Sequence, residues 1–347
     1  MPGRLKKFDE FFQRKAAEGG NVVAMARMGL AMRERGELAE AESWYRKAAM
    51  GGDRVSMTAL AHLLAERGAR DEADRWYHEA ALAGESHGMQ YLARSCERRG
   101  KRDEARHWYG EAARTGDLPS MAALGRLLRE DGQREEAESW LRQAADAGFT
   151  AAMIDLGIVL RDRGQAAEAA RWWRSAVQAG DLAATCQLGR QAERLGRPAD
   201  AESWYRQGAR GGHVEAITRL GLLLHRRGDV EEAENWYLEA AEHGDPAAMT
   251  NLGVLARNRG DEGEAAAWYR KAAEHGSIPA LTNLGHLAEH REDLAQAEQW
   301  FRRAAETGDV QGMLSLARML RARGAAHEAD LWLARAETVQ DEREHQH

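Results

Sequence analysis

The chain has 347 residues, 30% of them charged, and a formal net charge of −7 at pH 7. This acidic balance disfavours a protein that binds nucleic acid or a membrane surface through a basic face, because both partners attract positive charge. No stretch approaches the roughly 18 apolar residues of a transmembrane helix, and the start MPGRLKKFDEFF lacks the apolar run of a secretory signal, so we expect a cytoplasmic protein.

A tryptophan stands at the same place in ten consecutive segments of 32 residues, without an insertion or deletion between them. A fixed period of about 20 to 50 residues is typical of stacked repeats, in which each unit buries its apolar face against its neighbours. The sequence therefore predicts one elongated domain with a continuous core. We expect these tryptophans to pack in that core rather than to bind a ligand. They are Trp44, Trp76, Trp108, Trp140, Trp172, Trp204, Trp236, Trp268, Trp300 and Trp332.

The period divides the chain into four parts. Residues 12–20, FQRKAAEGG, align with the second half of a repeat, so we expect a capping helix before the first full repeat. The parts are an N-terminal tail (1–4), a capping half-repeat (5–20), ten repeats (21–337) and a polar C-terminal tail (338–347).

Each repeat holds two predicted helices. In the first repeat, apolar residues recur at helical spacing over residues 21–35 and again over 38–50. Gly36 and Gly52 follow these segments and can adopt the left-handed backbone that ends a helix. Asp53 precedes the next helix and can cap its N-terminus, as can aspartates at the same place in other repeats.

Charged residues mark the helix ends. An arginine such as Arg35 closes most first helices, and an acidic residue such as Glu40 opens most second helices. Each sign complements the dipole at its helix end. We interpret these residues as solvated helix ends rather than as basic and acidic binding stripes.

Several segments resemble the Sel1-like branch of the tetratricopeptide repeat family. WYRKAAEHG (268–276), WYLEAAEHG (236–244) and AESWYRKAA (41–49) are similar to its second helix, and MTNLG (249–253) and LTNLG (281–285) to its first. The resemblance implies an all-α fold, a right-handed α-solenoid (superhelix) of ten helix-turn-helix repeats with an N-terminal capping helix. The unit of 32 residues is shorter than the tetratricopeptide repeat of about 34, which leaves the superhelical pitch open.

The first helices line the concave groove in this family, and the groove is where we expect function. We call residues at the same position of every repeat a column. Where packing does not fix the residue type of a column, its residues can differ between repeats and recognise a particular partner. The column two residues before a recurring glycine or alanine is polar throughout the last six repeats. Amide side chains at this spacing can hydrogen-bond an extended peptide. The six residues are Asp155, Gln187, Arg219, Asn251, Asn283 and Ser315.

A neighbouring column is basic in several repeats. Its arginines, together with Arg219, could clamp carboxylates of an acidic partner segment. The alternative is that Glu97, Glu193 and Glu289, which lie near them in sequence, neutralise the arginines. The arginines of this column are Arg94, Arg126, Arg190 and Arg318.

One motif suggests metal chemistry. His286, Glu289 and His290 match the H-x-x-E-H pattern, in which two histidines on one helical face can bind zinc. No third ligand is evident, and other repeats place ordinary helix residues at the two histidine positions. We therefore expect no metal site, and retain a metal-dependent hydrolase as a remote alternative.

Other reactive residues have simpler interpretations. Cys96 and Cys186 lie in the first helices of the third and sixth repeats, too far apart in a linear stack to form a disulfide. We interpret both as packing residues. No phosphate loop, nucleophile elbow or dinucleotide fingerprint occurs in the sequence, so we expect no cofactor.

These features favour a non-enzymatic scaffold or adaptor that binds a partner protein, or a peptide with acidic residues, in the concave groove. The alternative is a regulator whose solenoid responds to a peptide or small molecule. Neither nucleic acid nor membrane is an expected partner. Leu331, Trp332 and Leu333 keep the last helix apolar and make it a candidate for weak self-association.

Overall fold

The structure is a computed structural model that describes residues 13–345, with side chains described as far as residue 341. The regular elements of these residues are all α-helices. The chain divides into two compact units, Met1–Ala179 and Gly180–His347, and five helix pairs fall in each. The ten predicted helix-turn-helix repeats are thus confirmed.

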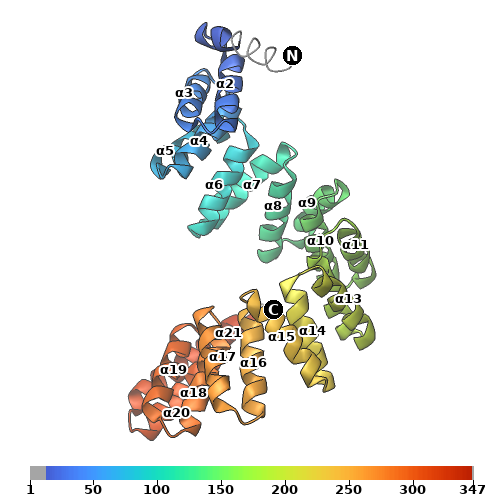
Figure 1. The fold of residues 1–347 in the computed structure, drawn as a ribbon, viewed down its shortest axis with the longest axis vertical. Coiled ribbons are helices and arrows are strands. Elements are labelled where there is room, and N and C mark those ends of the chain that lie inside the picture. The colour runs from blue at the N-terminus through green and yellow to red at the C-terminus, as the bar shows by residue number, and fades with distance from the viewer. Residues whose placement is uncertain (1–12, 346–347) are drawn as a thin grey trace. The chain divides into compact units, whose positions relative to one another are not determined.

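In the first unit, each helix packs against its partner within the repeat, and each second helix packs against the first helix of the next repeat (Figure 1). The first helices are α2 (Val22–Glu34), α4 (Arg54–Glu66), α6 (Ser86–Arg98), α8 (Leu118–Glu130) and α10 (Thr150–Asp162). The second helices are α3 (Leu38–Met50), α5 (Arg70–Leu82), α7 (Arg102–Arg114), α9 (Arg134–Asp146) and α11 (Ala166–Gln178).

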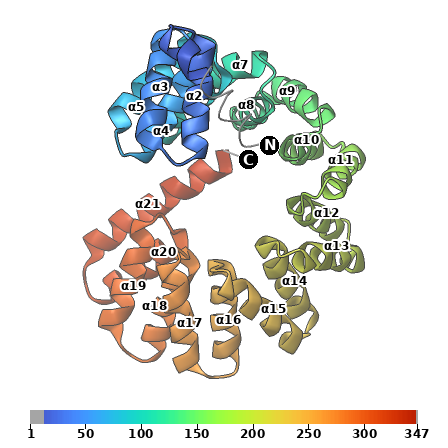
Figure 2. The ribbon, with the colours of Figure 1, turned by 45° about the horizontal axis from the view of Figure 1, so that its top comes forward.

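The second unit repeats this alternation (Figure 2). Its first helices are α12 (Ala183–Arg194), α14 (Val214–Arg227), α16 (Pro246–Asn258), α18 (Ile278–His290) and α20 (Val310–Ala322). Its second helices are α13 (Pro198–Arg210), α15 (Val230–Glu242), α17 (Glu262–Glu274), α19 (Leu294–Glu306) and α21 (Ala326–His345).

Both ends of the described chain are helical. Residues 13–18 of the expected capping helix are helical, whereas 5–12 lie outside the described residues. The last helix, α21, continues to His345 and so includes most of the expected polar tail. In this helix Leu331 is exposed, while Trp332 and Leu333 pack against a buried apolar cluster.

The helix ends follow the predicted chemistry. Asp53 accepts a hydrogen bond of 2.8 Å from the backbone N–H of Ser56 and so caps α4. Gly52, just before it, has a φ of 89°, a left-handed conformation that glycine adopts without strain. Asp181 departs from this pattern, because α12 begins one residue later, at Ala183.

The most deeply buried aromatic column stands one residue after the tryptophans. Tyr205, Tyr237 and Tyr269 are fully buried, whereas Trp204, which precedes Tyr205, is half-buried. Where a first helix carries the recurring glycine, the absence of a Cβ makes room for the side chain of this column. A Cβ on Gly253, for example, would lie 2.5 Å from Cε1 of Tyr269. The tryptophan column therefore lies at the border of the core, and the column that follows it fills the core.

A ladder of ion pairs joins successive second helices. Arg46 donates to Glu42 on its own helix at 2.8 Å and to Glu72 on the next second helix at 2.7 Å. Arg67, at the end of the intervening first helix, also donates to Glu42, at 2.8 Å. The charged helix ends are thus linked across repeats, beyond their match to the helix dipoles. The arginines that bridge in the same way are Arg142, Arg206 and Arg302.

A second ladder joins successive first helices. The hydroxyl of Thr58 donates to the cap residue of the next first helix, Glu85, at 2.7 Å. Thr282 does the same with Asp309, at 2.8 Å. Glu85 and Asp309 thus accept from their own helix and from the preceding repeat, which ties the start of these repeats to the ones before them.

Candidate partner-binding surface

The predicted polar column lies on first helices of both units. Asp155 is on α10 in the first unit, and the other five residues are on consecutive first helices of the second unit. Asn251, Asn283 and Ser315 are half-buried, and their side chains make no hydrogen bond with another of the described residues. Gln187 shares both properties. These side chains keep donors and acceptors available to a partner.

The surroundings of Asp155 disfavour the ionised form of its carboxyl group. Burial raises the pKa of its carboxyl, and the nearby Arg129 and Arg126 only partly oppose that rise. Its carboxylate has no hydrogen bond or ion pair among the described side chains. A cationic or hydrogen-bonding group from a partner would stabilise the ionised form.

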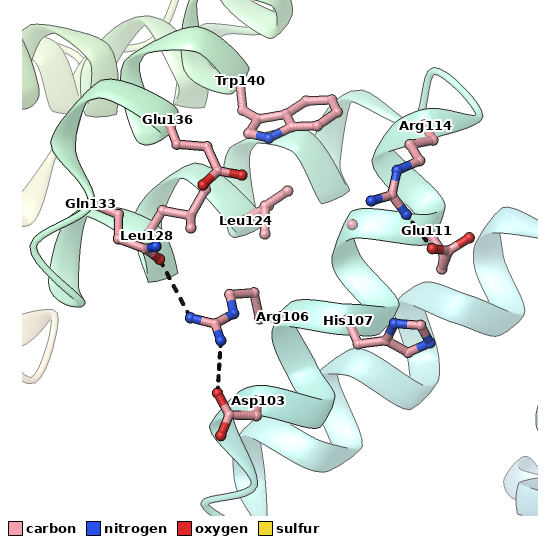
Figure 3. Close-up of a pocket in the computed structure, with 11 residues that line it drawn as sticks. Asp103, Arg106, His107, Glu111, Arg114, Leu124, Leu128, Gln133, Glu136 and Trp140 are labelled. Carbon is pink, nitrogen blue, oxygen red and sulfur yellow. Dashed lines mark hydrogen bonds and ion pairs between the residues drawn. The ribbon is translucent and has the colours of Figure 1, made fainter.

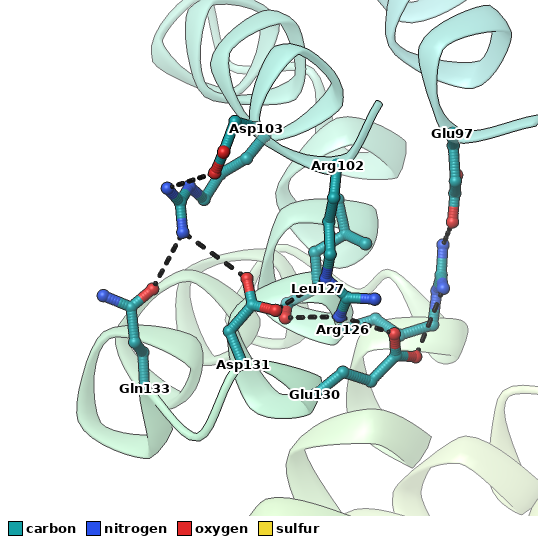
Figure 4. Close-up of polar contacts among 9 residues, drawn as sticks. Glu97, Arg102, Asp103, Arg126, Leu127, Glu130, Asp131 and Gln133 are labelled. Carbon is teal, nitrogen blue, oxygen red and sulfur yellow. Dashed lines mark hydrogen bonds and ion pairs between the residues drawn. The ribbon is translucent and has the colours of Figure 1, made fainter. Parts of the chain in front are cut away.

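In the first unit, the predicted arginine clamp is already engaged. Arg126 donates to Glu97 at 2.6 Å and lies 3.4 Å from Glu130 (Figure 4). Tyr109 donates to the same Glu97 at 3.0 Å. Burial would raise the pKa of Glu97, but these hydrogen bonds outweigh it and hold the pKa below its usual value. Arg94, on α6, is exposed and forms no ion pair with another described residue.

In the second unit, Arg190 and Arg219 share one carboxylate. Arg219 donates to Glu215 at 2.9 Å, and Arg190 forms a close ion pair with the same oxygen. Burial raises the pKa of Glu215, yet the two arginines outweigh it and leave the pKa below its ordinary value. Glu193, which the sequence suggested as a neutralising partner, binds Arg226 instead, at 2.6 Å.

The motif histidines have separate partners. His286 packs edge-on against Phe301, with ring centroids 4.9 Å apart, and lies 3.7 Å from Glu289. His290 pairs with Glu262 of α17 at 2.7 Å. The described residues contain no group of three or more histidine, cysteine or acidic side chains that could hold a metal ion.

Glu289 is also the partner of Arg318. The two side chains lie 2.7 Å apart, and this hydrogen bond lowers the pKa of Glu289. All the predicted clamp arginines except Arg94 thus lie in ion pairs within the chain. A partner carboxylate would have to displace these contacts.

Sequence comparisons agree with the repeat geometry. Models of the tetratricopeptide repeat match residues 22–47, 120–147, 150–175, 186–247 and 247–274, and a model of the Sel1 repeat matches 87–117 and 278–309. The chain is a tetratricopeptide and Sel1-like repeat protein. No curated protein sequence matches it.

Solved structures of repeat proteins share this fold. One is c5321, a protective antigen present in uropathogenic Escherichia coli strains displaying an SLR fold; it is 25% identical, with 94% of this chain and 79% of that chain covered and a TM-score of 0.57. A Sel1 repeat protein from Oxalobacter formigenes is 26% identical over 62% of this chain and 98% of that chain, with a TM-score of 0.50. Yeast Tom70, 13% identical over 92% of each chain with a TM-score of 0.54, shares the fold alone.

The two cysteines of this Sel1-like repeat protein are both free thiols. Cys186 is buried, 3.6 Å from Nδ1 of His213, and burial raises its pKa to about 12. Burial also raises the pKa of Cys96. Thiols with raised pKa values are poor nucleophiles, which agrees with a packing role. Among the helices of residues 13–345, none has the length and apolar character needed to span a membrane.

Proposed function

We propose that this repeat protein is a non-enzymatic scaffold or adaptor that binds a peptide segment of a partner across the first helices of its second unit. Repeats of this family typically mediate protein interactions, and the first helices line the groove that does so. The observation that carries the proposal is the row of Asn251, Asn283 and Ser315. They stand one repeat apart, half-buried, without hydrogen bonds to other described residues.

The chemistry of this row suits an extended backbone. Asparagine offers both a donor and an acceptor, so Asn251 and Asn283 can each pair with a backbone amide of a bound peptide. The polar atoms of these side chains are not among the buried unpaired ones, so a bound peptide would replace their contacts with water. Gln187 extends the row toward the start of the unit.

The arginines then have a secondary role. Because Arg190 and Arg219 already pair with Glu215, we assign them a smaller share of the binding energy than the polar row. Of the predicted clamp arginines, Arg94 in the first unit is the one that is exposed and forms no ion pair with a described residue.

The test compares two triple variants of the full chain in affinity capture from native extract with quantitative mass spectrometry. One variant carries Asn251→Ala, Asn283→Ala and Ser315→Ala. The matched control removes the same chemistry from exposed sites on second helices, with Ser203→Ala, Asn235→Ala and Gln299→Ala.

We expect at least one protein that wild type and the control retain to be lost from the first variant. Equal retention by both variants would contradict the proposed surface. Equal loss from both would also contradict it, because binding would then depend on the second helices as much as on the first.

A further inference from the structure

The ladder of bridging arginines has a gap between the third and fourth repeats. In the ladder, an arginine on one second helix reaches the acidic residue that opens the next second helix, as Arg142 reaches Glu168 at 3.0 Å. At this position α7 carries Gly110, and a Cβ added there would meet nothing within 4 Å. The acidic residue that such an arginine would reach, Glu136, is exposed, and its side chain makes no hydrogen bond or ion pair with any described residue.

The missing side chain leaves a pocket of about 340 Å³ between α7, α8 and α9. Figure 3 shows Trp140 and Glu136 on one side of it, Arg106 and His107 on the opposite side, and Leu124 between them. This volume lies at the lower end of the range for ligand pockets, about 300 to 1,000 Å³.

Other interfaces show that a lost arginine need not leave a free carboxylate. Leucine replaces it at Leu238, and there Glu264 pairs with Arg259 at 3.0 Å. Histidine replaces it at His78, and there Glu104 pairs with Lys101 at 2.9 Å. At Gly110 the space stays open and the carboxylate stays unpaired.

The charges around the pocket favour a cation. Arg106 donates to Asp103 at 2.9 Å (Figure 3). It also lies 3.4 Å from Asp131. Arg114 forms a close ion pair with Glu111. These pairs balance one another, so the remaining charge is the carboxylate of Glu136.

We propose that this pocket receives the guanidinium of an arginine side chain presented by a partner protein, in the place that a bridging arginine occupies elsewhere in the ladder. Glu136 accepts two N–H groups of the planar guanidinium, and the ring of Trp140 contacts its face. Leu124 and Leu128 contact the methylene stem. Lysine, a point charge without a planar fork, fits this arrangement less well.

The site is separate from the first-helix surface of the second unit, so its test stands independently of the proposed function. The readout is the indole N–H signal of Trp140 in NMR spectra of the full chain, assigned with Trp140→Phe. The probes are Nα-acetyl-arginine amide, the corresponding citrulline and lysine amides, agmatine, and inorganic phosphate.

We expect the arginine amide to shift this signal in a saturable way, the neutral citrulline amide not to shift it, and the lysine amide to bind several-fold more weakly. Glu136→Gln should weaken arginine binding at least ten-fold, whereas Glu135→Gln, at a neighbouring position that does not line the pocket, should leave it unchanged. Gly110→Arg should abolish binding by filling the pocket from within, and Gly110→Ala should preserve it.

Four results would overturn the proposal. Equal binding of the citrulline amide, or unchanged binding by Glu136→Gln, would remove the carboxylate from recognition. A shift with phosphate but not with the arginine amide would make the pocket an anion site. Tighter binding of agmatine than of the amide would assign it to a small free ligand instead of a partner protein.

Discussion

The indole of Trp173 occupies the space that a side chain at Gly157 would need. A Cβ on Gly157 would lie 2.2 Å from Nε1 of the indole, and Trp173 is fully buried. The same nitrogen donates to the carbonyl oxygen of Ile154 at 3.0 Å, which fixes the ring in place. Contact between a first helix and a second helix within a repeat therefore depends on this glycine.

We expect Gly157→Ala to destabilise the protein by about 2 kcal/mol, because the buried ring must shift and overpacking outweighs the better helix propensity of alanine. The matched control is Gly110→Ala, also inside a helix but with nothing within 4 Å of the added Cβ. It should stabilise by up to about 1 kcal/mol. Urea unfolding measures both, and similar changes for the two variants would contradict the packing explanation.

The local structure could be predicted from the sequence because local chemistry decides it. The apolar spacing and flanking glycines predict a helix over 38–50, and α3 has the same bounds. Asn21, expected inside the first helix, is instead its cap and accepts from the N–H of Ala24 at 3.0 Å. Caps and first residues are hard to separate by composition alone.

Contacts between repeats could not be predicted in the same way. Arg190 and Glu215 are 25 residues apart, and their pairing depends on how one repeat stacks on the next. The burial of Leu141 rather than its neighbour Trp140 depends on the angle at which paired helices cross. The sequence places Gly110 in the same column as Arg142 and Arg206. Only the structure shows that these arginines bridge to the next repeat and that Gly110 leaves a gap there.

Glu292 is the one non-glycine residue with a positive φ, 60°, among those that the structure describes. It stands where other repeats have glycine, so it carries a strain of about 1 to 2 kcal/mol. We expect Glu292→Gly to stabilise the protein by about 1 kcal/mol, because the relief of strain exceeds the entropy that glycine loses on folding. The reciprocal change in the preceding repeat, Gly260→Glu at a φ of 83°, should destabilise by a similar amount in calorimetry. A destabilised Glu292→Gly variant would show that the glutamate side chain contributes more than its backbone costs.

The buried tyrosine column offers a comparison of two hydroxyls. Tyr205 donates to Glu193 at 2.7 Å, whereas the buried hydroxyl of Tyr237 has no partner among the described residues. We expect Tyr205→Phe to cost about 1 kcal/mol and Tyr237→Phe to be neutral or to stabilise by about 1 kcal/mol, because an unpaired buried hydroxyl is unfavourable. Phe301 already fills this column in a later repeat, which shows that phenylalanine fits. Chemical denaturation of the two variants measures the difference, and an equal loss in both would argue that Tyr237 has a partner.

Asp155 should make stability depend on pH in the direction opposite to that of a carboxylate in a salt bridge. Burial raises its pKa in the folded protein, so the folded state holds the proton more tightly than the unfolded state, where the pKa is about 3.9. Its contribution to stability therefore falls as the pH rises from about 4 through the folded-state pKa, and stays low above it.

We expect Asp155→Asn to be more stable than wild type at pH 7, with the difference shrinking toward pH 4, as thermal unfolding over that range would show. Asp155→Ala, which introduces the residue found at Ala123 in the preceding repeat, should behave in the same way and separates the loss of the charge from the gain of an amide. A difference that is constant with pH would mean that the carboxylate is solvated in the folded protein. A wild type more stable than both variants at pH 7 would mean that a cation within the chain already pairs with Asp155, which would remove it from the surface available to a partner.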